Sequence, residues 1–293
     1  MGVKGLYSYL RPHRKPLDST TVPKGLIGVD ALSVLYKFRG NTEAILAFLE
    51  TFKAAGATFL FVFDGKAPET KRDEVDERRT KRNDAREEAI VLKAYLDDSE
   101  TLLEVRDRKI IERKISVLEN GAWSMTREAR HAFQDVLRQK GIAFVKAKGE
   151  ADDVLMSLWH DHKLLGIISA DMDFLVGGVE RLWIPTEKGA EEICLSTILE
   201  YEDISMESFI DAAILCGVST GYTFLNMYPK KAFTFMRHYG CLEALAKKQP
   251  VLFDDISETM IQNVRSRFLL YSVPEELVRE DYRPIVEGLC LTN

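Results

Sequence analysis

The most constraining feature of this sequence is a series of short, continuously apolar runs separated by segments of helical character. Runs at 25–30, 58–64, 141–147, 166–171 and 181–185 have the length and composition of buried strands. Helical patterns lie between them, at 42–55, 126–140 and 150–162. Strands that are apolar on both sides and alternate with helices form parallel sheets covered on both faces, so the pattern predicts a mostly parallel α/β fold.

Two stretches depart from this alternation. Residues 71–130 are densely charged and largely helical in pattern, and residues from about 203 to 285 are helical without a further strand. We therefore expect an α/β core over 1–200 with a helical insertion at about 83–130. A C-terminal helical region is expected over 201–293.

Composition excludes several classes of protein. Hydrophobic residues make up 46% and charged residues 29% of the chain, which is typical of a globular protein. The net charge of -6 disfavours a non-specific nucleic-acid coat protein, which is usually basic. The four cysteines lack C-x-x-C spacing, which argues against zinc and indicates free thiols in a reducing, intracellular compartment, either nuclear or cytoplasmic. The sequence contains no apolar run of about 18 residues, so no membrane span is expected.

Acidic residues stand at the ends of the predicted strands. Ligands of open α/β sheets bind beyond the carboxyl ends of the strands, so these acids are expected to lie at one edge of the sheet. Two pairs of acids at i, i+2 spacing add further carboxylates: Glu150 with Asp152, and Asp171 with Asp173. The six candidates are Asp30, Asp64, Glu150, Asp152, Asp171 and Asp173.

Crowded carboxylates repel one another and need a positive partner, which divalent cations usually supply. A donor set of oxygen alone favours Mg²⁺ or Mn²⁺ over zinc. Such a cluster suits phosphodiester hydrolysis by two metal ions. The alternative for each aspartate taken singly is an ordinary turn or helix N-cap residue.

A basic face follows Asp64. At 100° per residue, Lys71, Arg78, Arg82 and, less closely, Arg86 share one side of a predicted helix. Such a stripe can clamp a scissile phosphate. The alternative is a solvated helix stabilised by pairs of opposite charge four residues apart.

Together these motifs resemble the flap endonuclease family of structure-specific 5′ nucleases, within the PIN-like fold. The likeness runs through "MGVKGL", "GVDALSVLYKF", "FVFDGKAPETK", "KGEADD" and "SADMDFL", in the family's order over about residues 1–240. The resemblance implies a PIN-like sheet flanked by helices, with the insertion at 83–130 as a helical arch. It also implies a helix-hairpin-like C-terminal region that binds duplex DNA.

The resemblance further implies roles for individual residues. The six acids would bind two Mg²⁺ ions, for which Mn²⁺ can substitute, while Lys71 and Arg78 would be catalytic and grip the scissile phosphate. Tyr36 would stack on a neighbouring base. The remaining expected substrate contacts are Gly2, Arg82, Lys230 and Lys231, with Lys93, Arg106, Arg108 and Lys109 as further candidates on the arch.

The sequence departs from the family at three places. Ser219 replaces a further ligand aspartate, and Asp211, about 80° away around a helix, is a poor geometric substitute. The duplex-binding turn lacks both of its glycines, which are Asn226 and Tyr228 here. No sliding-clamp motif is recognisable, since Arg265 occupies the place of an aliphatic residue.

The leading hypothesis is therefore a Mg²⁺-dependent 5′ nuclease, expected to be a monomer without membrane contact. Its partner would be DNA with a 5′ flap, nick or free 5′ end. The altered turn motivates one alternative, an RNA endonuclease of the same chemistry. Ser219 motivates another, a non-catalytic scaffold that binds nucleic acid or protein.

Overall fold

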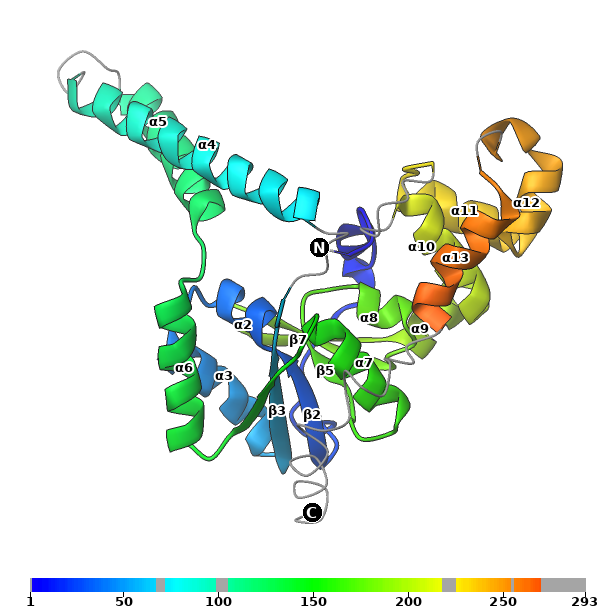
Figure 1. Ribbon diagram of the computed structural model, residues 1–293, viewed down its shortest axis with the longest axis horizontal. Helices are drawn as coiled ribbons and strands as arrows, with labels where there is room; N and C mark the ends of the chain where they lie inside the picture. Colours follow the sequence, from blue (N-terminus) through cyan, green and yellow to red (C-terminus); the bar gives the residue numbers. More distant parts are fainter. Residues whose placement is uncertain (1, 67–71, 99–104, 218–224, 254–255, 270–293) are drawn as a thin grey trace.

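The computed structural model describes residues 2–66, 72–98, 105–217, 225–253 and 256–269. A seven-stranded sheet in the order β1-β7-β6-β5-β2-β3-β4 forms the centre of the molecule (Figure 1). Neighbouring strands from β6 to β4 in this order are parallel, which confirms the predicted mostly parallel α/β fold. The strands are β1 (Lys15–Pro16), β2 (Gly25–Asp30), β3 (Ala57–Phe63), β4 (Ala143–Lys146), β5 (Ile167–Ile168), β6 (Arg181–Thr186) and β7 (Gly189–Cys194).

Two strands at one edge are absent from the sequence prediction. β7 pairs antiparallel with β6, and β1 pairs antiparallel with β7. In β7, Glu191 and Glu192 separate the buried Ala190 from the buried Ile193, so the strand has no continuous apolar run. A strand near the edge of a sheet keeps polar residues on its solvent side, so its sequence does not show the continuous apolar run that is typical of a buried strand.

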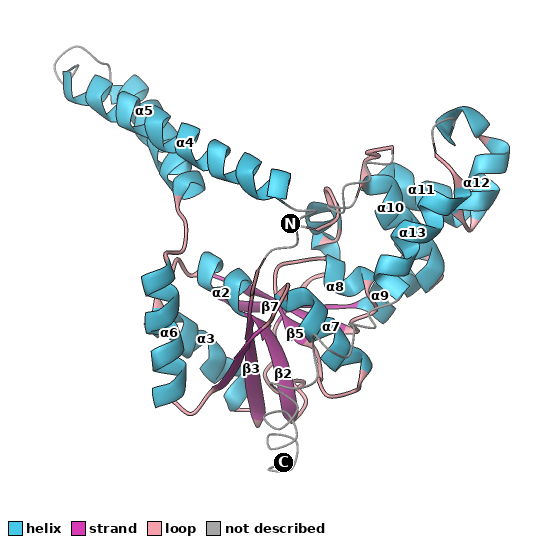
Figure 2. Cartoon of the chain, viewed as in Figure 1, coloured by secondary structure: helices cyan, strands magenta, loops and turns pink. Residues whose placement is uncertain are grey.

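Helices cover both faces of the sheet (Figure 2). Alternate residues of β3 supply the two cores: Phe61 and Phe63 pack with α2, α3 and α6, whereas Leu60 and Val62 pack with α7 and α8. The bounds are α1 (Leu6–Tyr9), η1 (Arg11–His13), α2 (Ala31–Lys37), α3 (Thr42–Lys53), α6 (Arg127–Gln139), α7 (Ala151–His160), α8 (Asp173–Val176) and α9 (Leu195–Glu202).

The charged insertion forms a hairpin of two long helices that projects from the body (Figure 1). Buried Ala89 and Leu96 of the first helix meet Ile115 and Ala122 of the second along the seam. The expected limits of 83–130 differ from the observed ones, because the first helix begins earlier and the second ends before the linker to α6. The arch hairpin consists of α4 (Arg72–Asp98) and α5 (Val105–Ala122).

The C-terminal region is helical as expected. Its helices are α10 (Met206–Cys216), α11 (Pro229–Tyr239), α12 (Leu242–Lys248) and α13 (Glu258–Leu269), with the short turn η3 (Pro250–Phe253). In the part of the chain that the structure describes, none of the helices has the length and apolar character needed to cross a membrane. Cys194, Cys216 and Cys241 are present as free thiols.

Asp211 has a structural role that the sequence does not reveal. Its side chain is fully buried, and it accepts hydrogen bonds from Arg265 Nε at 2.6 Å, from Arg265 Nη2 at 2.5 Å and from the Leu242 amide at 2.9 Å. Arg265 also donates to Glu243, whose pKa it lowers to about 2. Asp211 therefore ties α10 to α12 and α13. Because its carboxylate is occupied by these contacts, the structure agrees with the expectation that Asp211 does not substitute for the metal-ligand aspartate that Ser219 replaces.

Removal of Arg265 is expected to destabilise the protein strongly, because Asp211 would be left as a buried charge without its partner. Arg265→Met should lower the free energy of unfolding by about 3–5 kcal/mol. Urea unfolding of Arg265→Met, beside Arg113→Met at an exposed site of α5, measures the effect. A combined Asp211→Leu and Arg265→Met variant should be more stable than Arg265→Met alone; equal stability of Arg265→Met and wild type would contradict this role.

Candidate active site

The carboxyl edge of the sheet brings the strand-end aspartates together. β2 ends at Asp30, Asp64 follows β3 directly, and Asp171 follows the short β5. β2 lies between β3 and β5, and all three strands are parallel. The three aspartates therefore lie at one edge, as the sequence predicts.

A second chain segment is tied to this edge. The Gly65 amide donates to the Gly149 carbonyl at 2.7 Å, and the Ala151 amide donates to Asp64 Oδ1, also at 2.7 Å. A Cβ atom on Gly65 would overlap the backbone carbonyl of Lys148, so only glycine permits this close approach. The start of α7 is thus held beside Asp64.

Asp30 performs the ordinary capping role and also faces the other acids. Its Oδ1 accepts from the Ser33 amide at 3.0 Å at the start of α2, and its Oδ2 accepts from the Ser169 hydroxyl at 2.8 Å. The pKa of Asp30 is raised to about 6, chiefly by burial and to a smaller extent by the charges of Asp64 and Asp171, while these two hydrogen bonds act to lower it. Capping and clustering therefore coexist at this residue.

The pKa of Asp152 is also strongly perturbed. Burial raises its pKa well above the usual value, and the charges of the surrounding aspartates add to the rise. Glu150, the N-cap residue of α7, makes no capping hydrogen bond with its side chain. The aspartates that raise the pKa of Asp152 are Asp30, Asp171, Asp64 and Asp173.

The N-terminal segment lies directly against two of these carboxylates. The Val3 amide donates to Asp173 Oδ1 at 2.9 Å. A Cβ atom on Gly2 would overlap carboxylate oxygens of both Asp171 and Asp173, and Gly2 has a left-handed φ of 62°. The expected location of Gly2 beside the acids agrees with this geometry.

A divalent cation is the partner that this donor set fits chemically. The acids offer only oxygen, and a cation would offset both the burial and the mutual repulsion that raise the pKa values of Asp30 and Asp152. Within the described ranges, however, no three acidic, His or Cys side chains converge into a ready-made metal site. Asp64 and Asp173 each accept a hydrogen bond from a backbone amide through one carboxylate oxygen.

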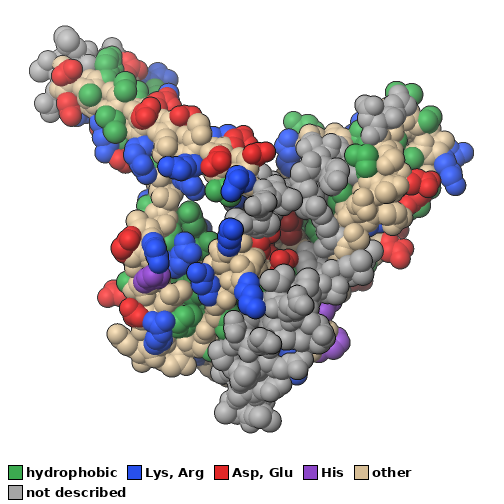
Figure 3. All heavy atoms as spheres, in the orientation of Figure 1, with side chains coloured by type: hydrophobic (Ala, Val, Ile, Leu, Met, Phe, Trp, Pro, Cys, Tyr) green, Lys and Arg blue, Asp and Glu red, His purple; other side chains and the backbone are tan. Residues whose placement is uncertain are grey.

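Two sequence-predicted residues fall outside the described ranges: Lys71 and Ser219. Arg78 and Arg82 lie on α4 with partly buried side chains. The alternative of a salt-bridged helix also holds locally, since Lys81 Nζ lies 2.6 Å from Glu77 Oε1. Figure 3 shows Lys and Arg side chains gathered along the side of the arch hairpin that faces the body, with Asp and Glu side chains mainly on the opposite side.

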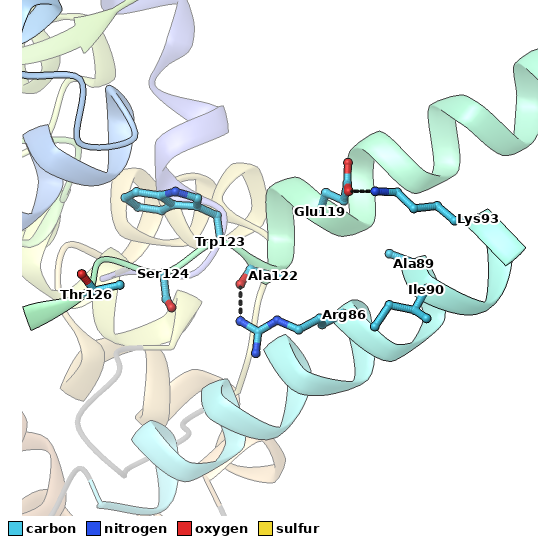
Figure 4. Close-up of a pocket in the computed structure, with 9 residues that line it drawn as sticks. All are labelled: Arg86, Ala89, Ile90, Lys93, Glu119, Ala122, Trp123, Ser124 and Thr126. Atoms are coloured by element: carbon cyan, nitrogen blue, oxygen red, sulfur yellow. Dashed lines mark hydrogen bonds and ion pairs between the residues drawn. The ribbon is translucent and has the colours of Figure 1, made fainter. Parts of the chain in front are cut away.

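A pocket of about 410 Å³ opens where the arch hairpin meets the body (Figure 4). On one side Arg86 of α4 reaches the Ala122 carbonyl at 3.5 Å, and on another Lys93 pairs with Glu119. The indole of Trp123 lies at the end of α5, and its ring meets that of Tyr36 edge-on at 5.1 Å. Trp123 and the exposed Tyr36 thus form an aromatic pair at the base of the arch.

The altered turn before α11 contains one residue in a left-handed conformation. Asn226 adopts a left-handed φ of 44°, which Asn tolerates better than most residues other than glycine. Tyr228 has an extended backbone and is 86% exposed. Lys230 and Lys231 follow in the first turn of α11, and both are exposed.

Sequence reasoning overlooked Ser33 and Ser169. The Ser169 hydroxyl donates to Asp30 and accepts from the Asp171 amide at 3.1 Å, and Ser33 Oγ accepts from the Ala170 amide at 2.8 Å. These hydroxyls join α2 to the segment after β5. The placement of Ser169 two residues before Asp171 is the only sequence signal for this role.

A mostly parallel sheet with acids at its carboxyl edge and a helical hairpin above it defines a PIN-like nuclease fold. The catalytic core of Rad2 in complex with DNA substrate matches with a TM-score of 0.61 and 17% identity, over 92% of this chain and 86% of that one. Flap endonuclease-1 from Methanococcus jannaschii matches with a TM-score of 0.55 and 18% identity, over 87% and 81%. Likeness at these identities establishes the fold.

The family follows from the sequence. Residues 1–85 match the XPG N-terminal domain and residues 141–219 match the XPG I-region, which together cover more than half of the chain. The chain belongs to this family, which confirms the resemblance to flap endonucleases.

Flap endonuclease 1-B of Sorghum bicolor is 29% identical over 221 residues, covering 73% of this chain and 48% of that protein. Flap endonuclease 1-A of Physcomitrium patens is 29% identical over 224 residues, covering 74% and 52%. The chain spans about half the length of these curated relatives.

Neutralising Asp30 is expected to stabilise the metal-free protein at neutral pH. Its pKa of about 6 in the folded protein exceeds the ordinary 3.8. Between these two pH values the folded state binds more protons than the unfolded state, so the free energy of unfolding falls as the pH rises, and the full loss is present above about pH 6. Asp30→Asn should therefore raise the free energy of unfolding by about 2–3 kcal/mol at pH 8, and the gain should vanish below about pH 4.

Urea unfolding in EDTA between pH 4 and 8 measures this difference. Asp18→Asn is the matched control, because Asp18 is exposed and hydrogen bonds from Thr20 lower its pKa. The control should show no gain at pH 8. A less stable Asp30→Asn protein at pH 8 would refute the electrostatic account.

Proposed function

We propose that the protein is a divalent-metal-dependent, structure-specific 5′ nuclease that hydrolyses phosphodiester bonds in branched or 5′-ended DNA. The observation that carries this proposal is the crowding of Asp30, Asp64, Asp152, Asp171 and Asp173 at one sheet edge. Membership of the XPG family and relatives named flap endonuclease support the reaction class and the substrate.

The six acids of the edge would hold two Mg²⁺ ions, or Mn²⁺ in their place. When bound, such ions activate water and stabilise the charge that develops on the phosphate. The protein's own contribution is orientation: Ser33 and Ser169 fix Asp30, and the Ala151 amide fixes Asp64. This support confines repelling carboxylates to one small region before any cation arrives.

Cations and aromatic rings above the edge would position the substrate. We assign Arg78, together with Lys71, to the scissile phosphate and Arg82 to the strand that passes the arch hairpin. The basic side of the hairpin faces the body, which suits a phosphate backbone running between them (Figure 3). Tyr36 is 41% exposed, so one face of its ring can stack on a base.

Duplex DNA would contact the start of α11. Lys230 and Lys231 are exposed in its first turn, where the helix N-terminus also favours phosphate. Contacts of this kind fix orientation without reading sequence. They fit a nuclease that recognises a junction between duplex and single strand.

RNA cleavage by the same chemistry is the second candidate. The specific observation is Tyr228, which stands exposed in place of a glycine at the turn. Exposed aromatic rings stack on unpaired bases, and most sequence-specific RNA recognition uses such stacking. A non-catalytic scaffold is the third possibility. It is less consistent with retained acids whose burial and mutual repulsion are costly unless they bind something.

Loss of an edge acid is expected to abolish hydrolysis. Asp64→Ala and Asp171→Ala should each lower kcat at least about 100-fold on a 5′-labelled flap substrate in Mg²⁺ or Mn²⁺, because transition-state charge would lose its cation support. Asp161→Ala, at an exposed site after α7, is the matched control. Full activity of Asp64→Ala would end the proposal.

A substrate panel separates the three candidates. Flap, nicked, single-stranded and RNA-flap substrates should be compared across a titration of Mg²⁺ and Mn²⁺. Cutting near the junction of the DNA flap is expected, since duplex and single strand would be held at α11 and at the arch hairpin. Equal or faster cutting of the RNA flap would favour the RNA endonuclease. Binding without any cutting would favour the scaffold.

A further inference from the structure

The N-terminal segment physically joins the acidic edge to the helix pair α10–α11. At one end the Val3 amide donates to Asp173 Oδ1 at 2.9 Å, and the next amide, of Lys4, donates to the Gly217 carbonyl after α10 at 3.0 Å. A Cβ atom on Gly5 would lie 3.2 Å from Pro229 Cδ, the first residue of α11. Successive residues therefore touch the acids, the end of α10 and the start of α11.

A buried carboxylate anchors the other end of this segment. Glu202 of α9 is 2% exposed and accepts from the Tyr9 hydroxyl at 2.9 Å and from Arg237 Nη1 at 2.6 Å. The Tyr9 ring packs on Phe233 of α11 with centroids 4.8 Å apart. His13 Nε2 lies 3.8 Å from the same carboxylate. Glu202 thus joins α1, α9 and α11 through side chains of the first and last.

The anchor is rigid for physical reasons. A buried carboxylate that loses a donor pays a desolvation penalty, so the Tyr9 and Arg237 contacts resist separation. Burial and Glu202 raise the pKa of Tyr9 above its usual range, so the hydroxyl remains a donor at physiological pH. Leu6 and Leu10, on either side of Tyr9, are fully buried. The helix α1 therefore has little freedom to slide against α11.

We propose that residues 2–10 act as a spacer that fixes the distance between the acidic edge and α11, and thereby sets which phosphate of a duplex-bearing substrate is cut. Tyr9 and Glu202 are its positioning residues. This role rests on the proposed nuclease function, since Lys230 and Lys231 at the start of α11 would hold the duplex while Asp171 and Asp173 face the scissile bond. A looser spacer would admit several phosphates to the acids instead of one.

The first test needs neither metal nor nucleic acid. Tyr9→Phe keeps the ring on Phe233 but removes the donor to Glu202, and Tyr7→Phe makes the same change at an exposed ring of α1. Hydrogen exchange should accelerate about five-fold at the Val3 and Lys4 amides in Tyr9→Phe, and should not change in Tyr7→Phe. Unchanged exchange in a folded Tyr9→Phe protein would refute the mechanical link.

The second test reads the position of the cut. On a flap substrate, Tyr9→Phe and Glu202→Gln should each lower the ratio of main to neighbouring cuts about five-fold, while kcat on single-stranded DNA stays unchanged. The double variant should be no worse than the more affected single variant, because both act through one network. An equal loss of kcat on the flap substrate and on single-stranded DNA would overturn the spacer role. An unchanged ratio of main to neighbouring cuts on the flap would overturn it too.

The two tests separate the spacer from the nuclease itself. Absence of any cutting by the wild type would refute the proposed function and, with it, the effect on incision. The exchange comparison would still decide whether Tyr9 and Glu202 hold the N-terminal segment in place.

Discussion

Repulsion among carboxylates crowded at one sheet edge is the constraint on which the rest of the structure depends. Parallel strands deliver Asp30, Asp64 and Asp171 to one edge, where burial, together with the neighbouring carboxylates, raises the pKa of Asp30. Donors from four segments hold acids of this edge: Ser33 and Ser169 donate to Asp30, the start of α7 donates to Asp64, and the N-terminal segment donates to Asp173. In our proposal, this crowding of carboxylates favours the binding of cations.

The remaining elements supply what the edge lacks. The arch hairpin carries basic side chains on the side that faces the body (Figure 3), and the first turn of α11 presents two lysines. Each element is stabilised by its own interior, the hairpin by Ala89 and Ile115 and the C-terminal helices by Asp211 with Arg265. The N-terminal segment connects the acidic edge with α11. In our proposal it therefore fixes the position of the duplex-binding lysines relative to the acids that carry out hydrolysis.

Several elements of the fold were predictable because their sequence periodicity is strong. The strands of the parallel part and the helices at 42–55, 126–140 and 150–162 are confirmed to within a few residues. The strand at 189–194 was not predictable, since its glutamates interrupt the apolar pattern. The first arch helix lies within the charged helical pattern from residue 71 onward, although the limits expected for the arch itself began later, at about 83. At the site, the acids were predictable from their place after apolar runs, whereas Ser33 and Ser169 were not, since a serine beside a turn is common.

The sequence by itself determined the parallel strands with the helices between them, the acids at the strand ends and the family, because these follow from local periodicity and from motifs contiguous in the chain. Only the tertiary structure decided that Asp211 pairs with Arg265, that Val3 reaches Asp173 and that Tyr9 meets Glu202. The physical reason is that a hydrogen bond between residues far apart in the chain depends on the packing of whole elements. Spacing along the sequence carries no record of that packing.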